Sequence, residues 1–309
     1  MMATTGSAPA VALIIHRRPS QTRRVFDAIR SQRPRQLFVI ADGPASPSQA
    51  ELVAQARAAT DDVDWPCDVT RVYSPTNLGC RERVLTGLDA VFAETTQAII
   101  LEDDCLPDRS FFGFAQSLLE RYAAVEEVMS VGGHLWHLPD GFSEHSYWFS
   151  SYPAVWGWAT WRRAWHQYAP AAAEWSTVRE TDWIERRFGG RTTAAQYWRL
   201  ALDGELAGSS TWDYTWTLAH WLNGSLAARS STNLISNIGF GDDATHTFDA
   251  THPSASRASS NLSLPITHPP AIRADDTYET LLEDAVHSGV INRRITLARS
   301  RLRRAPERG

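Results

Sequence analysis

An alternation of strand-length and helix-length segments in the first 123 residues constrains the fold more than any other feature. Segments of strand length lie at 11–15, 37–41, 68–73 and 98–102. A segment with helical spacing of its apolar residues follows each of them, at 20–30, 47–59, 81–92 and 109–123. Strands that alternate with helices form parallel sheets through right-handed crossover connections. The sequence therefore predicts an α/β fold around a parallel sheet of about four strands.

Three consecutive acids, Glu102, Asp103 and Asp104, follow the apolar run at 98–101. In open α/β sheets, ligands bind at the carboxyl ends of the strands. Adjacent carboxylates repel one another unless a cation or solvent neutralises them. The residues alone leave two interpretations open. The acids hold a divalent metal through oxygen ligands, or they form a solvated loop or an acidic helix N-terminus.

Polar residues also follow the first two predicted strands. Arg17 comes after the first strand and Asp42 after the second. Because the carboxyl ends of parallel strands meet at one edge of a sheet, we expect a single crevice to collect these side chains together with the three acids.

Tryptophan is concentrated in the middle of the chain: 12 of the 13 Trp residues lie between Trp136 and Trp221. A buried indole N–H needs a partner, so this enrichment demands an explanation. Two explanations remain open, and both can hold for different Trp residues. The rings form an aromatic core under long loops, or they form a wall against the apolar face of a sugar.

The second half gives weaker signals of secondary structure. Residues 175–202 have helical character, and a further helix is expected over 211–221 with Thr211 as its cap. The Ser-, Pro- and Thr-rich stretch 249–270 predicts an extended surface loop. One or two helices are expected within 275–300.

Composition excludes several classes of function. All 30 basic residues are Arg, which rules out mechanisms that need a lysine, such as Schiff bases and the Walker-A loop. The formal charge of −5 gives no global case for a nucleic-acid partner. Three cysteines without metal-ligand spacing suit a reducing compartment. No apolar run of 18 residues and no signal-peptide pattern is found, so we expect a cytoplasmic protein.

Two stretches carry a resemblance to a known family. The acids 102–104, followed by Leu-Pro-Asp-x-x-Phe-Phe, resemble the Glu-Asp-Asp motif of N-acetylglucosaminyltransferase I. The stretch Asn-Leu-Ile-Ser-Asn-Ile-Gly-Phe-Gly at 233–241, with Thr-His-Thr at 245–247, resembles bacterial proteins of the HlpA-like group. Over about residues 10–250 the chain resembles nucleotide-sugar glycosyltransferases of the family-two type. That resemblance implies a GT-A fold, with a mostly parallel sheet and an aromatic-rich acceptor half.

The resemblance also implies a role for each matching position. Asp42 matches the acid that contacts the nucleotide base, and Arg83 a position that contacts base or phosphate. Glu102 and Asp103 match positions that hold the ribose or the water shell of the metal. The remaining matches are Asp104 as a direct ligand of Mn²⁺ or Mg²⁺, His246 as a further metal ligand, and Asp213 as the catalytic base. The usual Asp-Asp-Gly-Ser is Ala-Asp-Gly-Pro at 41–44, so the motif does not fix the nucleotide.

The function expected from the resemblance is a metal-dependent, inverting transfer of a sugar from a nucleotide-sugar donor, with a UDP-sugar expected, to a hydroxyl acceptor. The acceptor is a glycan, a lipid-linked sugar or a small molecule. Two alternatives remain: a nucleotidyltransferase that makes the nucleotide sugar, and a carbohydrate-binding protein without activity. The absence of Gly and Lys between residues 11 and 20 counts against the nucleotidyltransferase.

The predicted organisation is one glycosyltransferase domain at 1–250 and a C-terminal extension at 251–309. Within the domain, 10–132 form the nucleotide-binding half and 133–250 the acceptor half. Seven arginines crowd the end of the chain among sparse apolar residues, from Arg293 to Arg308. This extension is either a basic helix in peripheral contact with the inner membrane face or a solvated tail.

Overall fold

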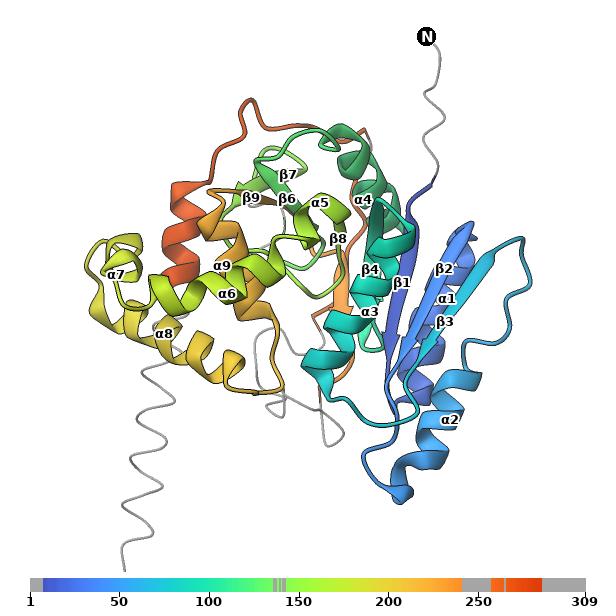
Figure 1. Cartoon of the computed structure of the whole chain (residues 1–309). Coiled ribbons are helices and arrows are strands. Elements are labelled where there is room, and N and C mark those ends of the chain that lie inside the picture. The colour runs from blue at the N-terminus through green and yellow to red at the C-terminus, as the bar shows by residue number, and fades with distance from the viewer. Residues whose placement is uncertain are drawn as a thin grey trace, which may run out of the picture.

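The computed structural model describes residues 8–135, 138, 140, 143–240, 257–263 and 265–284 (Figure 1). His246 and the Arg-rich stretch from Arg293 to Arg308 lie outside these residues.

The predicted strands and helices of the first half are confirmed within a few residues. The strands are β1 (Ala10–Ile15), β2 (Gln36–Ala41), β3 (Asp68–Tyr73) and β4 (Gln97–Glu102). The helices are α1 (Pro19–Gln32), η1 (Pro47–Gln49), α2 (Ala50–Ala58), α3 (Cys80–Glu94) and α4 (Arg109–Arg121). The apolar periodicity is strongest where the strands β1, β2 and β4 are buried on both faces and the helices α1, α3 and α4 each bury one face.

The sheet has eight strands in the order β3-β2-β1-β4-β8-β6-β9-β7. The additional strands are β6 (Val128–Gly132), β7 (Tyr147–Ser150), β8 (Trp158–Trp161) and β9 (Leu226–Ser230). Strands β3, β2, β1 and β4 are parallel, as predicted, whereas β8 is antiparallel to both β4 and β6. The α/β class is confirmed, but the sheet is mixed and twice as wide as predicted. The added strands have only four or five residues, too few for a clear periodic signal.

A short antiparallel pair lies directly after the acids. Strand β5 (Cys105–Pro107) pairs with β10 (Ile235–Asn237), so two segments about 130 residues apart are joined at the end of β4. The pairing fixes the chain on both sides of the acid triplet.

The helices of the second half correct two predictions. They are α5 (Arg162–Trp165), α6 (Tyr168–Val178), α7 (Trp183–Arg187), α8 (Thr192–Leu206) and α9 (Asp213–Leu222). The helical character expected over 175–202 is confirmed for most of the stretch, but it is not continuous: Gly189 and Gly190 take positive φ angles of 56° and 81° and separate α7 from α8. Thr211 is not the cap of α9: the N-cap position is Trp212, which makes no side-chain capping bond.

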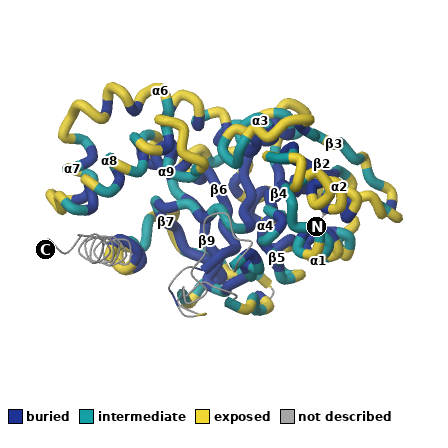
Figure 2. Tube along the Cα trace, turned by 90° about the horizontal axis from the view of Figure 1, so that it is seen from below, coloured by how far each residue is buried: buried dark blue, intermediate teal, exposed yellow. Residues whose placement is uncertain are grey.

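Two apolar layers cover the two faces of the sheet. One contains Ile14, Ile40 and Ile100 with residues of α3 and most of the Trp side chains, and the other contains Leu13 and Leu101 with residues of α1 and α4. The central strands are accordingly buried, whereas the edge strand β3 is partly exposed and α6, α7 and α8 expose their outer sides (Figure 2). The first of the two explanations for the Trp enrichment therefore holds for most of these residues. Nine of them between Trp148 and Trp221 are buried: Trp148, Trp158, Trp161, Trp165, Trp175, Trp198, Trp212, Trp216 and Trp221.

The described part of the predicted C-terminal extension packs against residues 146–151 and Arg191. The backbone N–H of Ser146 donates to the Thr267 hydroxyl, and the backbone N–H of Thr267 donates to the Ser146 hydroxyl. The Glu279 carboxylate accepts a hydrogen bond from the hydroxyl of Ser150 at 2.6 Å. Residues 276–284 form a helix, and its Glu283 forms an ion pair with Arg191 on α8. These contacts tie 257–284 to β7 and α8.

Candidate active site

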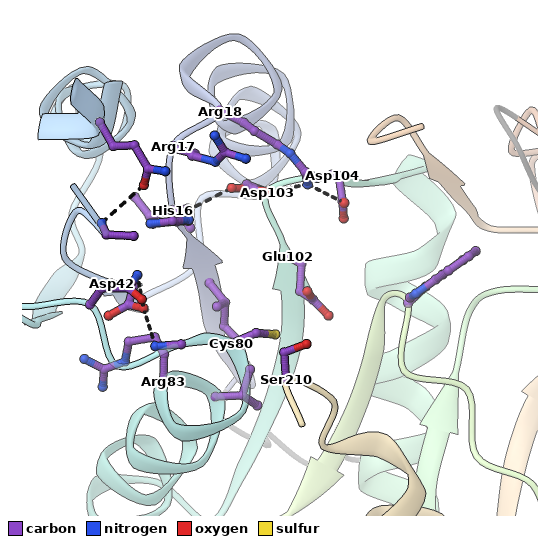
Figure 3. A pocket seen from close by; sticks show the side chains of 18 of the residues that line it. His16, Arg17, Arg18, Asp42, Cys80, Arg83, Glu102, Asp103, Asp104 and Ser210 are labelled. Atoms are coloured by element: carbon purple, nitrogen blue, oxygen red, sulfur yellow. Dashed lines mark hydrogen bonds and ion pairs between the residues drawn. The ribbon is translucent and has the colours of Figure 1, made fainter. Parts of the chain in front are cut away.

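A cleft of about 380 Å³ opens at the carboxyl ends of β1, β2 and β4. Five of the residues selected from the sequence line it, as Figure 3 shows: Asp42, Arg83, Glu102, Asp103 and Asp104. Arg17 lines it as well, so the crevice expected from the strand ends is present. Asp213 is not among the lining residues, and His246 lies outside the described residues.

Strand register separates the three acids. Glu102 pairs with Ile14 across β4 and β1, and Ile14 pairs with Ile40 on β2. Side chains alternate between the faces of a strand, so Glu102 lies on the face that α3 covers. Within the part of the chain that the structure describes, its carboxylate accepts no hydrogen bond. Glu102 therefore presents uncommitted oxygen acceptors to the cleft.

Asp103 and Asp104 share one counter-ion, which the sequence analysis did not select. Arg18 Nη1 lies 3.2 Å from Asp103 Oδ1 and 2.6 Å from Asp104 Oδ2. Asp103 also accepts the backbone N–H of His16 at 3.0 Å. Burial alone lowers the pKa of Arg18, but the two carboxylates outweigh this effect and raise it. The only sequence signal for Arg18 was its place just after a strand that neighbours β4.

Crowding of negative charge shifts the pKa values of two acids. Burial, followed by the charges of Asp104 and Asp103, raises the pKa of Glu102 to about 8. Burial and the charge of Asp104 raise the pKa of Asp103 to about 6, with Arg18 opposing. Burial and the neighbouring carboxylates thus disfavour the charged forms of both acids, and a cation bound beside them would stabilise those forms.

A close backbone approach closes one side of the site. The backbone carbonyl of Asp104 accepts the N–H of Ile238 at 2.8 Å. A Cβ on Gly239 would lie only 2.3 Å from Asp104 Oδ2. Glycine is thus required where the 233–241 motif passes the last acid, which gives a physical reason for part of that motif.

Asp42 is committed to the loop between β3 and α3. Its carboxylate accepts the backbone N–H groups of Gly43, Leu78 and Gly79, and the side-chain amide of Asn77, at 2.9–3.0 Å. The residue is only 4% exposed. The Asp42 carboxylate thus holds the loop that contains residues 77–79 in place.

Arg83 lies on the first turns of α3, beside the same loop. It is buried, and among the described residues its Nε has no hydrogen-bond partner. Burial lowers its pKa, and the charge of Asp42 opposes that effect. A buried guanidinium with an unused donor at the wall of a cleft is suited to an anionic or carbonyl-bearing ligand.

Asp213 is the first residue of α9, and a residue from α8 fixes this end of the helix. Glu205 Oε2 accepts the N–H of Tyr214 at 3.0 Å, and Oε1 accepts that of Thr215 at 2.9 Å. The Asp213 charge contributes to the raised pKa values of Glu102 and Cys80, so its carboxylate lies near the acid triplet. Burial raises the pKa of Asp213 itself.

The floor of the cleft holds three residues that the sequence analysis did not select as site residues: Cys80, Ser210 and Trp156. Cys80 and Ser210 point toward Glu102 in Figure 3. Burial and the charges of Glu102 and Asp213 raise the pKa of Cys80 to about 12, so it is a neutral thiol and no nucleophile. Trp156 is half-buried, and His134 and Phe240 pack against it at ring distances of 4.8 and 6.0 Å. Among the described residues it is the Trp that lines the cleft.

The three acids at the end of β4 offer the type of ligand atom that a hard divalent cation binds. Carboxylate oxygens are what Mg²⁺ and Mn²⁺ prefer, and the raised pKa values of Glu102 and Asp103 favour an added positive charge. Over residues 8–240 and 257–284, apart from the gaps named above, no group of three or more His, Cys, Asp or Glu side chains is arranged to hold a metal ion. Arg18 is the cation that Asp104 contacts.

Neither a family model nor a curated protein sequence matches this chain. Several solved structures are partly similar to it at 10% sequence identity. TarS of S. aureus, residues 1–349, aligns with 73% of this chain and 59% of its own, with a TM-score of 0.41. The chain thus spans less than two thirds of that TarS structure.

Two further structures are similar at the same identity. They are 4-diphosphocytidyl-2C-methyl-D-erythritol synthase of Anaerococcus prevotii (54% of this chain, 78% of that one, TM-score 0.32) and a UDP-glucose pyrophosphorylase complexed with UDP-glucose (51% and 78%, TM-score 0.29). The likeness is partial and concerns the arrangement of strands and helices alone. Separately, none of the helices in the described residues is long and apolar enough to cross a membrane.

Proposed function

We propose that the protein is a metal-dependent glycosyltransferase that moves a sugar from a nucleotide-sugar donor to a hydroxyl acceptor with inversion. One observation carries the proposal: three acids at the end of β4 share a cleft with Arg17, Arg18 and Arg83. Carboxylates beside cationic side chains suit a ligand that combines phosphates, hydroxyl groups and a divalent cation.

The donor is bound by residues from three segments. Arg83 contacts the base or a phosphate, and Glu102 and Asp103 accept hydrogen bonds from ribose or from metal-bound water. Asp104 and His246 hold Mn²⁺ or Mg²⁺. When bound, the metal neutralises the charge of the departing nucleoside diphosphate as a Lewis acid.

Asp213 acts as the general base. Its carboxylate takes the proton of the acceptor hydroxyl while that oxygen bonds to the anomeric carbon and the bond to the nucleoside diphosphate breaks. Burial raises its pKa, which makes it a stronger base than an exposed Asp. Attack on the face opposite the leaving group inverts the anomeric configuration.

A thermal-shift screen tests donor binding. Each of four nucleotides is added at about 1 mM, with and without Mn²⁺: UDP, GDP, CDP and ADP. A true ligand raises the Tm of the protein by mass action. We expect UDP with Mn²⁺ to give the largest rise and EDTA to abolish it. No rise with any nucleoside diphosphate would refute the proposal.

Adding nucleoside triphosphates, sugar phosphates and free sugars to the screen separates the alternatives. A nucleotidyltransferase binds a nucleoside triphosphate with a sugar phosphate and releases pyrophosphate, whereas a glycosyltransferase releases a nucleoside diphosphate from the donor. A carbohydrate-binding protein gains Tm with sugars and gains none with nucleotides.

A further inference from the structure

The loop between β3 and α3, residues 74–79, is organised around a single carboxylate. Asp42 accepts three backbone N–H groups, from Gly43, Leu78 and Gly79, and the Nδ2 group of Asn77. Leu78 N also lies 3.2 Å from the second oxygen. A carboxylate has about four lone-pair sites, and all are engaged by these donors. Asp42 therefore has no acceptor left for a nucleobase.

The same network fixes the orientation of Asn77. Its Nδ2 lies 3.0 Å from Asp42 Oδ2 and 3.0 Å from the carbonyl oxygen of Gly43. Both neighbours are acceptors, so the amide nitrogen must face them and cannot exchange places with the oxygen. Both amide hydrogens are used, and within the described residues Oδ1 makes no hydrogen bond. Asn77 lines the cleft.

We infer that Asn77 reads the nucleobase through Oδ1, which accepts the imide N–H of uracil or guanine, and that Asp42 is the residue that positions it. This inference rests on the proposed function for the identity of the ligand. It reassigns base contact from Asp42 to the loop that Asp42 holds. A ring imide N–H is the one donor that uracil offers on its pairing edge, and Oδ1 is an acceptor fixed in direction.

The anchoring part is tested without any ligand. In Asp42→Asn, an NH₂ group faces N–H donors of the loop and the buried bonds are lost. We expect the Tm of the free protein to fall by about 4 °C or more. Asp68→Asn, at an exposed acid on β3, is the matched control and should change Tm by about 1 °C or less. An unchanged Tm in Asp42→Asn would show that Asp42 does not anchor the loop.

The reading part is tested with UDP and 3-methyl-UDP, and with GDP and 1-methyl-GDP, by calorimetry with Mn²⁺. The wild type should bind the unmethylated member of one pair about tenfold more tightly, the scale of one hydrogen bond. Asn77→Ala should bind both members of that pair equally, at the affinity of the methylated one. Asn261→Ala, at an exposed Asn, should keep the wild-type ratio.

The outcomes are distinguishable. If Asn77→Ala still prefers the unmethylated nucleotide as strongly as the wild type, Asn77 does not read the base, although the proposed function stands. If the wild type binds none of these nucleotides, the proposed function and the reading by Asn77 fail together. The effect of Asp42→Asn on the free protein then still decides the anchoring.

Discussion

The carboxylate of Glu205, on α8, caps the helix that begins at Asp213. It accepts two N–H groups of the first turn, from Tyr214 and Thr215, and is completely buried. A helix N-terminus leaves N–H groups unsatisfied and carries a partial positive charge, which a carboxylate stabilises. Glu205 thus holds the proposed catalytic base from eight positions earlier in the chain.

Glu205→Gln is expected to destabilise the protein and displace Asp213. The amide keeps one acceptor and turns a donor toward an N–H group, so the free energy of unfolding should fall by about 2 kcal/mol. Urea denaturation measures the loss, with Glu174→Gln on the exposed side of α6 as the control. Wild-type stability in Glu205→Gln would show that the cap contributes little.

Asp213→Asn is expected to lower turnover about 10²-fold or more, because the amide cannot accept the acceptor's proton. Nucleotide affinity should stay within about twofold, since Asp213 does not line the cleft. Steady-state transfer assays and calorimetry measure the two quantities. Turnover near that of the wild type would remove Asp213 from the mechanism.

Asp104→Ala is expected to abolish the metal dependence of nucleotide binding, because the direct ligand proposed for Mn²⁺ is lost. It also removes the 2.6 Å contact of Arg18 with Asp104 and leaves its ion pair with Asp103 in place. Titration of UDP with Mn²⁺ and with EDTA separates these effects, with Asp68→Ala as the control. If Mn²⁺ strengthens binding in the variant as much as in the wild type, Asp104 is not the ligand.

His220, in the last turn of α9, predicts a pH dependence of stability. It is completely buried, with Nδ1 3.0 Å from the Trp216 carbonyl and Nε2 2.9 Å from the Ser130 hydroxyl. The neutral ring satisfies both bonds by donating from Nδ1 and accepting at Nε2. Burial lowers its pKa from 6.5 to about 4, with the bond to Trp216 opposing.

The sign of the effect follows from the lowered pKa. The unfolded chain binds a proton near pH 6.5 and the folded protein only near pH 4, so stability falls as pH drops through this window. The full loss from His220 is about 3 kcal/mol. Chemical denaturation at pH 7, 5.5 and 4 measures it, and His220→Gln should show a shallower decline. Parallel declines in the two proteins would mean that His220 is not the titrating group.

The sequence by itself determined the first half of the fold and the place of the acids. Strands β1 to β4 and the helices between them follow from local apolar periodicity, because each element is buried against the same sheet in a regular way. The position of Glu102 at a strand end follows from the same pattern. Parallel strands end at one edge, and this geometry alone predicted that Asp42 and Arg17 meet the acids.

Only the tertiary structure decided which polar side chains of the cleft are already hydrogen-bonded within the protein and which remain available to a ligand. Residues from separate elements meet in four places. Strand β8 pairs with β4, and Arg18 contacts Asp104. The Asp42 carboxylate accepts N–H groups of the 74–79 loop, and Glu205 caps α9. Such contacts depend on how packed elements orient their side chains in space, and no local period encodes that. The same reason explains why the sequence could not say which Trp residues fill the core and that Trp156 lines the cleft.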